Sequence, residues 1–291
     1  MSNVIWSTTN DTDWGTSGNW STGSVPVNSD NVFLERSTID VAGSLDQSSV
    51  ALTLLHIRST MLGKVGTIDS PLQIGTSRLV IGDQQERLLG GGSTRINVDL
   101  GSATACNAVI FSTAVRSSDT GLTPVRLLAN NSSTNVRVDR GQVSIAPLSD
   151  DTSTVGVIQL GLQSSKLEDV WCYVGRGVTW TTLNATGGRC LVHSAGTTIN
   201  IYGGEVTSEG THAITTVNIY GGSFVHKSSG TVTTVNMYGG MLDLQQSSDA
   251  RTITNVNLLS GAPAVKYHPS VTLTNKLNPS YLVNAGFGVP G

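Results

Sequence analysis

The sequence has little charge and few of the residues that specialised chemistry requires. Only 13% of its 291 residues are charged and the formal net charge is −3, so the chain offers no polycationic surface for nucleic acid. Its three cysteines (Cys106, Cys172 and Cys190) are odd in number, and their spacing fits no zinc pattern. We therefore expect buried thiols rather than a metal site or a disulfide, and we predict no cofactor.

Long apolar runs and a secretory leader are also missing. No stretch reaches the roughly eighteen apolar residues of a membrane-spanning helix, so no membrane partner is expected. The segment Met1–Trp6 has neither a basic region nor an apolar core of the kind that directs secretion. These absences predict synthesis and folding in a cytoplasm.

What the sequence does contain is a repeat. A motif of the form Thr-Val-Asn-Ile-Tyr-Gly-Gly begins at Thr182, Thr198, Thr216, Thr234 and Asn255, after intervals of 16, 18, 18 and 21 residues. A β-rich period near twenty residues is typical of a solenoid, in which each repeat forms one coil. Two or three short strands in each coil would stack in parallel on the next coil, about 4.8 Å away.

Within each motif the residues alternate between apolar and polar, as in a strand with one buried face. The middle polar position is always asparagine, and amides at strand spacing can hydrogen-bond along the solenoid axis. This pattern predicts a structural ladder formed by Asn184, Asn200, Asn218, Asn236 and Asn257. The next outward position carries Tyr202, Tyr220 and Tyr238, a row that could contact another subunit or a glycan, or stabilise the sheet by itself.

These repeats resemble the right-handed parallel β-helix proteins, of the kind found as phage virion surface proteins. The resemblance is specific for about residues 180–265 and carries no catalytic motif. Upstream β patches recur without a clean period, which favours longer, irregular coils of the same solenoid over a separate β-sandwich. Around Leu45–Leu55 the residues fit either a short helix or a strand.

The two ends differ from the repeats. The segment Gly18–Phe33 is similar to the opening segment of many bacterial and phage β-solenoids, and residues 1–40 are interpreted as a cap over the open end. Residues 41–265 then form the solenoid, regular after about 180, and 266–291 form an extended, proline-containing tail. Docking is expected at these ends, with Trp6, Trp14 and Trp20 as candidate contacts in the cap.

No catalytic arrangement stands out. Carboxylates in the regular repeats do not align, although glycoside hydrolases need two carboxylates that face each other. The arginines Arg137, Arg140, Arg176 and Arg189 could gather on one side, but solvated ion pairs are the favoured interpretation. The five histidines show neither metal spacing nor a triad partner.

A stable, low-charge solenoid without catalytic residues fits a viral structural protein. We expect a non-enzymatic phage capsid decoration protein at the virion surface, which self-associates, as a homotrimer, and binds the major capsid protein or another virion protein. One alternative is a tail fibre or tailspike that binds host glycan. The other is a β-helix polysaccharide lyase or hydrolase.

Overall fold

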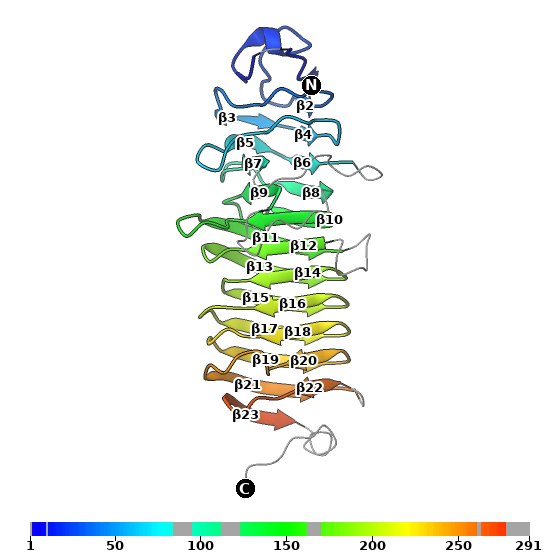
Figure 1. The fold of residues 1–291 in the computed structure, drawn as a ribbon, viewed down its shortest axis with the longest axis vertical. Helices are drawn as coiled ribbons and strands as arrows, with labels where there is room; N and C mark the ends of the chain where they lie inside the picture. The colour runs from blue at the N-terminus through cyan, green and yellow to red at the C-terminus, as the bar shows by residue number, and fades with distance from the viewer. Residues whose placement is uncertain are drawn as a thin grey trace.

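The computed structural model is a stack of parallel β-coils (Figure 1). It describes residues 2–9, 11–83, 95–111, 123–161, 170–260 and 263–277. Each coil contributes one strand to each of two sheets, and every pairing between named strands is parallel. In the described part of the chain the one helix is a 3-10 turn at Ser17–Asn19, and no helix there is long and apolar enough to cross a membrane.

The first sheet runs the whole length of the stack, in the order β1, β2, β4, β6, β8, β10, β11, β13, β15, β17, β19, β21, β23. Its strands are β1 (Asn3–Ile5), β2 (Asn31–Leu34), β4 (Leu54–Ile57), β6 (Arg78–Ile81), β8 (Asn107–Phe111), β10 (Asn135–Ile145), β11 (Ser153–Leu160), β13 (Val178–Ala185), β15 (Gly196–Ile201), β17 (Ile214–Ile219), β19 (Val232–Met237), β21 (Arg251–Leu258) and β23 (Val271–Leu277).

The second sheet lies opposite, and the long strand β10 belongs to both sheets. Its other strands are β3 (Asp46–Leu52), β5 (Leu72–Thr76), β7 (Ile96–Asp99), β9 (Val125–Leu128), β12 (Val170–Val174), β14 (Arg189–Val192), β16 (Glu205–Ser208), β18 (Ser223–His226), β20 (Met241–Asp243) and β22 (Ala264–Lys266). The unbroken series of pairings confirms an all-β parallel solenoid and leaves no separate β-sandwich among the described residues.

The core lies between the two sheets, where alternate residues of every strand point inward. In the regular coils the buried pairs predicted from the repeat, such as Val217 with Ile219, are fully enclosed. In four of these coils Gly-Gly follows shortly after the strand, and Gly222 shows why. Its φ is +66°, and a Cβ there would lie 2.4 Å from the carbonyl oxygen of Gly204 in the preceding coil.

The cysteines are part of this core. Cys106, Cys172 and Cys190 are free and buried, as the sequence predicted, and Cys172 lies in register beside Cys190 on neighbouring coils. Burial raises the pKa of the Cys106 thiol to about 12 and that of Cys190 well above its ordinary value. These thiols therefore act as small apolar side chains.

Two expectations about the first half are now resolved. The ambiguous Leu45–Leu55 region is strand, since β3 and β4 occupy it. The predicted cap already holds two strands of the first sheet, because β1 pairs with β2 and β2 with β4. At the other end β22 and β23 extend the coils past residue 265, and residues 278–291 of the predicted tail lie outside the described part of the chain.

The three tryptophans form the interior of the N-terminal end. Trp20 packs edge-on against Trp6 and Trp14, with ring centroids 5.0 and 4.6 Å apart, and its indole N–H donates to the Trp14 carbonyl at 2.8 Å. All three are at most 2% exposed. They are therefore not available as surface contacts, which corrects the docking role suggested for Trp6, Trp14 and Trp20.

Candidate functional site

The regular coils carry the predicted asparagine ladder on the outward side of the first sheet. From Asn200 onward each side-chain amide donates from Nδ2 to Oδ1 of the asparagine in the preceding coil, at 2.7–2.9 Å. The ladder comprises Asn184, Asn200, Asn218, Asn236 and Asn257. These side chains are half-buried, and the continuous bonding satisfies amide groups that would otherwise be costly to bury.

The predicted tyrosine row lies at the margin of the same sheet. Tyr202, Tyr220 and Tyr238 are 52%, 43% and 43% exposed, and their rings stack with centroids 4.9 and 4.7 Å apart and planes within 7° of parallel. Stacking thus covers both faces of the Tyr220 ring and one face each of Tyr202 and Tyr238. A sugar that binds an aromatic platform needs an open ring face, so this geometry favours a flat partner surface over a sugar.

A threonine column completes this surface, because Thr198, Thr216 and Thr234 lie in register on the other side of the asparagines. We call these three columns together the Thr–Asn–Tyr strip; it consists of Thr198, Thr216, Thr234, Asn200, Asn218, Asn236, Tyr202, Tyr220 and Tyr238. The strip is uncharged, and Leu259, which is 52% exposed, lies in the following coil just beyond the asparagine column.

Nearer the N-terminus the asparagine column continues with different residues. Strand pairing places one after another, on β4, β6, β8 and β10, the residues His56, Val80, Val109 and Arg137. Two small valines thus lie between two larger side chains. The result is a hollow of about 400 Å³ on the outward side of the first sheet.

We call this the mixed-charge hollow. Its floor is apolar and consists of Val80, Val109 and Phe111, and its polar groups are His56, Arg78, Asp83, Arg137 and Asp139. Glycine at position 82 allows the backbone there to lie close to Phe111 in the next coil, because a Cβ would lie 2.0 Å from the Phe111 carbonyl oxygen. An apolar floor with a few convergent polar groups is the usual composition of a ligand site.

His56 and Asp83 form a fixed pair at one side. The His56 Nε2 atom lies 3.1 Å from the Gly82 carbonyl oxygen and 3.2 Å from Asp83 Oδ1, so it carries the proton and donates to these acceptors. Burial lowers the pKa of His56, against the opposing effects of Gly82 and Asp83. Burial alone would raise the pKa of Asp83, but hydrogen bonds from Ser59 and the nearby positive charge lower it overall.

The two arginines of the hollow differ in their ion pairing. Arg137 binds Asp139 through two contacts of 2.8 and 2.7 Å, and the Asp139 side chain is 0% exposed. The Arg78 side chain is exposed, and its guanidinium has no hydrogen bond or ion pair with any residue of the described ranges. Among the described residues Arg78 is therefore a cation without a partner.

Two of the four arginines considered in the sequence form partly exposed ion pairs, as the favoured interpretation expected, and these two lie on different sheets. Arg137 belongs to the first sheet, whereas Arg189 lies on β14 of the second sheet, 3.9 Å from Glu205. The sequence interpretation also missed the His56–Asp83 pair, because the two residues lie 27 positions apart in irregular coils. The one available signal was that Asp83 follows a β patch ending in Val80-Ile81-Gly82.

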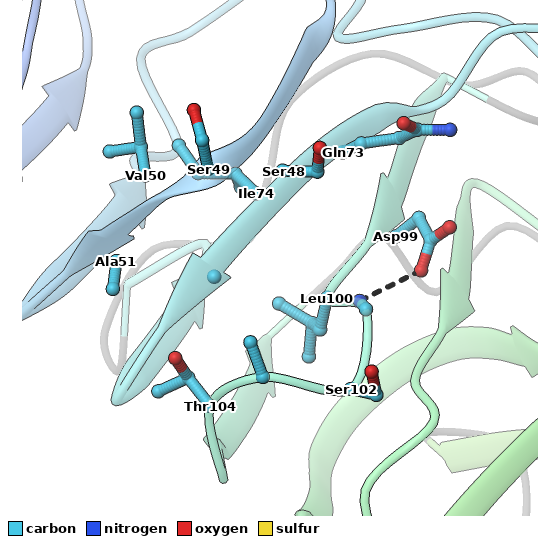
Figure 2. Close-up of a pocket in the computed structure, with 13 residues that line it drawn as sticks. Ser48, Ser49, Val50, Ala51, Gln73, Ile74, Asp99, Leu100, Ser102 and Thr104 are labelled. Carbon is cyan, nitrogen blue, oxygen red and sulfur yellow. Dashed lines mark hydrogen bonds between the residues drawn. The ribbon is translucent and has the colours of Figure 1, made fainter.

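A second hollow of about 280 Å³ lies over the second sheet (Figure 2). Hydroxyl and small side chains surround it, among them Ser48, Ser102 and Thr104. Its lining holds a single carboxylate, Asp99, whose Oδ1 accepts the Gly101 N–H at 2.9 Å as part of a turn. This lining offers no pair of groups for acid–base chemistry.

Buried histidines form a third group at one edge of the regular coils. His226 is fully enclosed and shares a 2.9 Å hydrogen bond between Nδ1 and Ser208 Oγ. Burial lowers the pKa of His212 to about 4 and that of His226 to about 3, with help from His193 and Arg251 respectively. Both imidazoles are therefore neutral at pH 7.

Among the described residues no group of three or more His, Cys, Asp or Glu is placed to hold a metal ion. Comparisons with family models, with curated proteins and with solved structures found no match for this chain. The functional argument therefore rests on the two surfaces of the first sheet, the Thr–Asn–Tyr strip and the mixed-charge hollow.

Proposed function

We propose that this chain is a non-enzymatic structural protein that decorates the outside of a viral capsid. Its copies associate with one another through the Thr–Asn–Tyr strip, as a homotrimer, and bind the major capsid protein or another virion protein. The observation that carries this proposal is the row of exposed tyrosines, whose rings stack on one another in successive coils.

Three properties of the strip suit contact with another protein surface. It is rigid, because strand pairing and the amide ladder hold successive coils in register. It is uncharged, so its burial costs no ion desolvation. It presents tyrosine, which is enriched at protein interfaces because an apolar ring and a polar hydroxyl lie on one side chain.

The proposed location on a virus particle is supported by the low-charge solenoid and by the similarity of Gly18–Phe33 to the opening segment of many bacterial and phage β-solenoids. In this arrangement the capped end contacts the shell, and repeated contacts along the Thr–Asn–Tyr strip join neighbouring subunits. Many weak contacts made together bind more tightly than any one of them.

The first test measures the mass of the full chain in solution. Mass photometry of the wild type is expected to show a trimer, and the pair Tyr202→Ser and Tyr220→Ser is expected to shift it to a monomer. The matched control is Leu62→Ser, an exposed apolar residue away from the strip. A wild-type monomer, or a trimer that the tyrosine variant leaves intact, would overturn the role of the strip.

The second test concerns location. Cryo-electron microscopy of the parent particle is expected to show the solenoid at many positions on the shell. Density confined to the tail would replace the decoration role with that of a tail protein. Cleavage of a glycan panel, detected as new reducing ends or unsaturated products, would replace it with an enzymatic one.

A further inference from the structure

We infer that the mixed-charge hollow is a binding site for an acidic saccharide, in which Arg78 receives the carboxylate and the valine floor receives the sugar ring. This site lies apart from the Thr–Asn–Tyr strip and does not depend on the shell-binding role.

The hollow has the length and floor that a short saccharide needs. His56 and Arg137 are three strand spacings apart, each of about 4.8 Å, with only Val80 and Val109 between them. The gap between the two larger side chains is therefore on the order of 10 Å long. Its apolar floor suits the C–H face of a pyranose ring, whereas a bare inorganic anion would leave that floor uncovered.

The charges of the hollow leave one cation unused. The Arg137 guanidinium is held by Asp139, and Asp83 is held by the N–H and hydroxyl of Ser59 and by His56. Arg78 has no such partner among the described residues and lines the same hollow. A guanidinium binds a carboxylate through two parallel N–H···O bonds, so the ligand is expected to carry one carboxylate.

The remaining polar atoms suit the hydroxyls of a sugar. The Gly82 carbonyl oxygen and the exposed part of Asp83 accept hydrogen bonds, as sugar hydroxyls require. His56 holds its proton on Nε2, which leaves Nδ1 as a further acceptor on that ring. One cation surrounded by acceptors distinguishes an acidic saccharide from a polyphosphate, which would need several donors.

Isothermal titration calorimetry on the full chain tests this assignment with a uronic-acid disaccharide and its methyl ester. The ester keeps the shape of the sugar and removes its charge. The acid is expected to bind more tightly than the ester by roughly tenfold to a hundredfold, the usual effect of a charged hydrogen-bonded pair. Equal affinities, or no binding of the acid, would overturn the inference.

Two variants locate the binding. Arg78→Gln is expected to lower the affinity for the acid to that for the ester, whereas Arg189→Gln, on the opposite sheet, leaves it unchanged. Val109→Phe fills the floor and is expected to abolish binding of both ligands, with circular dichroism as the check on folding. Equal losses in the Arg78 and Arg189 variants would overturn the site, as would a preference for sulfated over carboxylated sugars.

The outcome is separable from the proposed function. Arg78→Gln is expected to assemble and to decorate particles as the wild type does, since Arg78 lies outside the strip. Loss of saccharide binding with intact assembly supports both proposals, and a failure of either one leaves the other standing on its own measurements.

Discussion

The first sheet carries two surfaces built on the same column of residues. In the regular coils that column consists of asparagines, each bonded to the next. In the earlier coils it contains His56, Val80, Val109 and Arg137. The backbone pairing is equally parallel in both regions, so the surfaces differ through side-chain choice alone.

The comparison shows how a solenoid separates support from recognition. Where the same residue recurs in every coil, side chains satisfy one another and leave a flat surface. Where the residues change from coil to coil, small side chains next to large ones make a hollow, and polar groups of different kinds meet around it. We therefore assign assembly to the repeated region and ligand binding to the irregular one.

The largest expected effect separating the two regions is sensitivity to acid. His226 has a folded-state pKa of about 3, below its unfolded value near 6.5, so only the unfolded chain takes up the proton between these values. Stability is complete above about pH 6.5 and falls as the pH drops, by about 2 kcal/mol at pH 5 from this residue alone. Denaturant unfolding at pH 7.5, 6 and 5 measures the loss.

The His226→Phe variant is expected to reduce this pH dependence, since phenylalanine keeps the contact with Phe224 and cannot titrate. Hydrogen exchange at pH 5 should increase first in the regular coils. Earlier opening of the coils around His56 would contradict the comparison.

An ion pair with an enclosed carboxylate is expected to stabilise the irregular region. Asp139→Asn is expected to lower the free energy of unfolding by about 1.5–2 kcal/mol, because Arg137 loses a charged hydrogen-bond partner that is enclosed. Urea unfolding measures the change, with Asp46→Asn on the exposed strand β3 as the control, expected below about 0.5 kcal/mol. Equal effects would show that enclosure of Asp139 contributes nothing.

The amide ladder is expected to contribute somewhat less to the free energy of unfolding in the regular coils. Asn218→Ala removes one bond to Asn200 and one from Asn236, and we expect a loss of about 1–1.5 kcal/mol. Thr216→Ala, in the adjacent column, is the matched control. If the two variants unfold at the same urea concentration, the ladder contributes nothing to stability.

The smallest effect on stability is expected for the tyrosine row. Tyr220→Ala removes two stacking contacts and should cost about 0.5–1 kcal/mol, whereas Tyr220→Phe keeps both and should cost almost nothing. Thermal unfolding of the dissociated protein measures both. A large loss for Tyr220→Phe would mean that the hydroxyl rather than the stacking holds the row.

Sequence reasoning succeeded where the coils repeat. The asparagine positions, their inward neighbours and the stacked tyrosines all follow from a period of 16–21 residues, since identical positions in consecutive coils must lie side by side. The number of strands per coil was left at two or three, and the structure has two because the third apolar contact, such as Ile214, belongs to the same strand as the motif.

It failed where coil length varies. The paired residues His56 and Val80 are 24 positions apart in the sequence. Val80 and Val109 are 29 positions apart, so no constant spacing aligns them. The tryptophans misled for a different reason. A cluster of aromatic residues in a terminal segment suits either an exposed contact or a small core, and only the fold shows that Trp20 lies between the other two.

The asparagine ladder also has a direction. Asn200, Asn218 and Asn236 each donate toward the N-terminal coil and accept from the C-terminal one, so each of their coils offers the acceptor that the next coil needs. A duplicated 18-residue coil would find its bonding partner on both sides without any other change. The regular region can therefore lengthen in whole coils, each adding about 4.8 Å, and gene duplication becomes a means of setting the reach of the molecule.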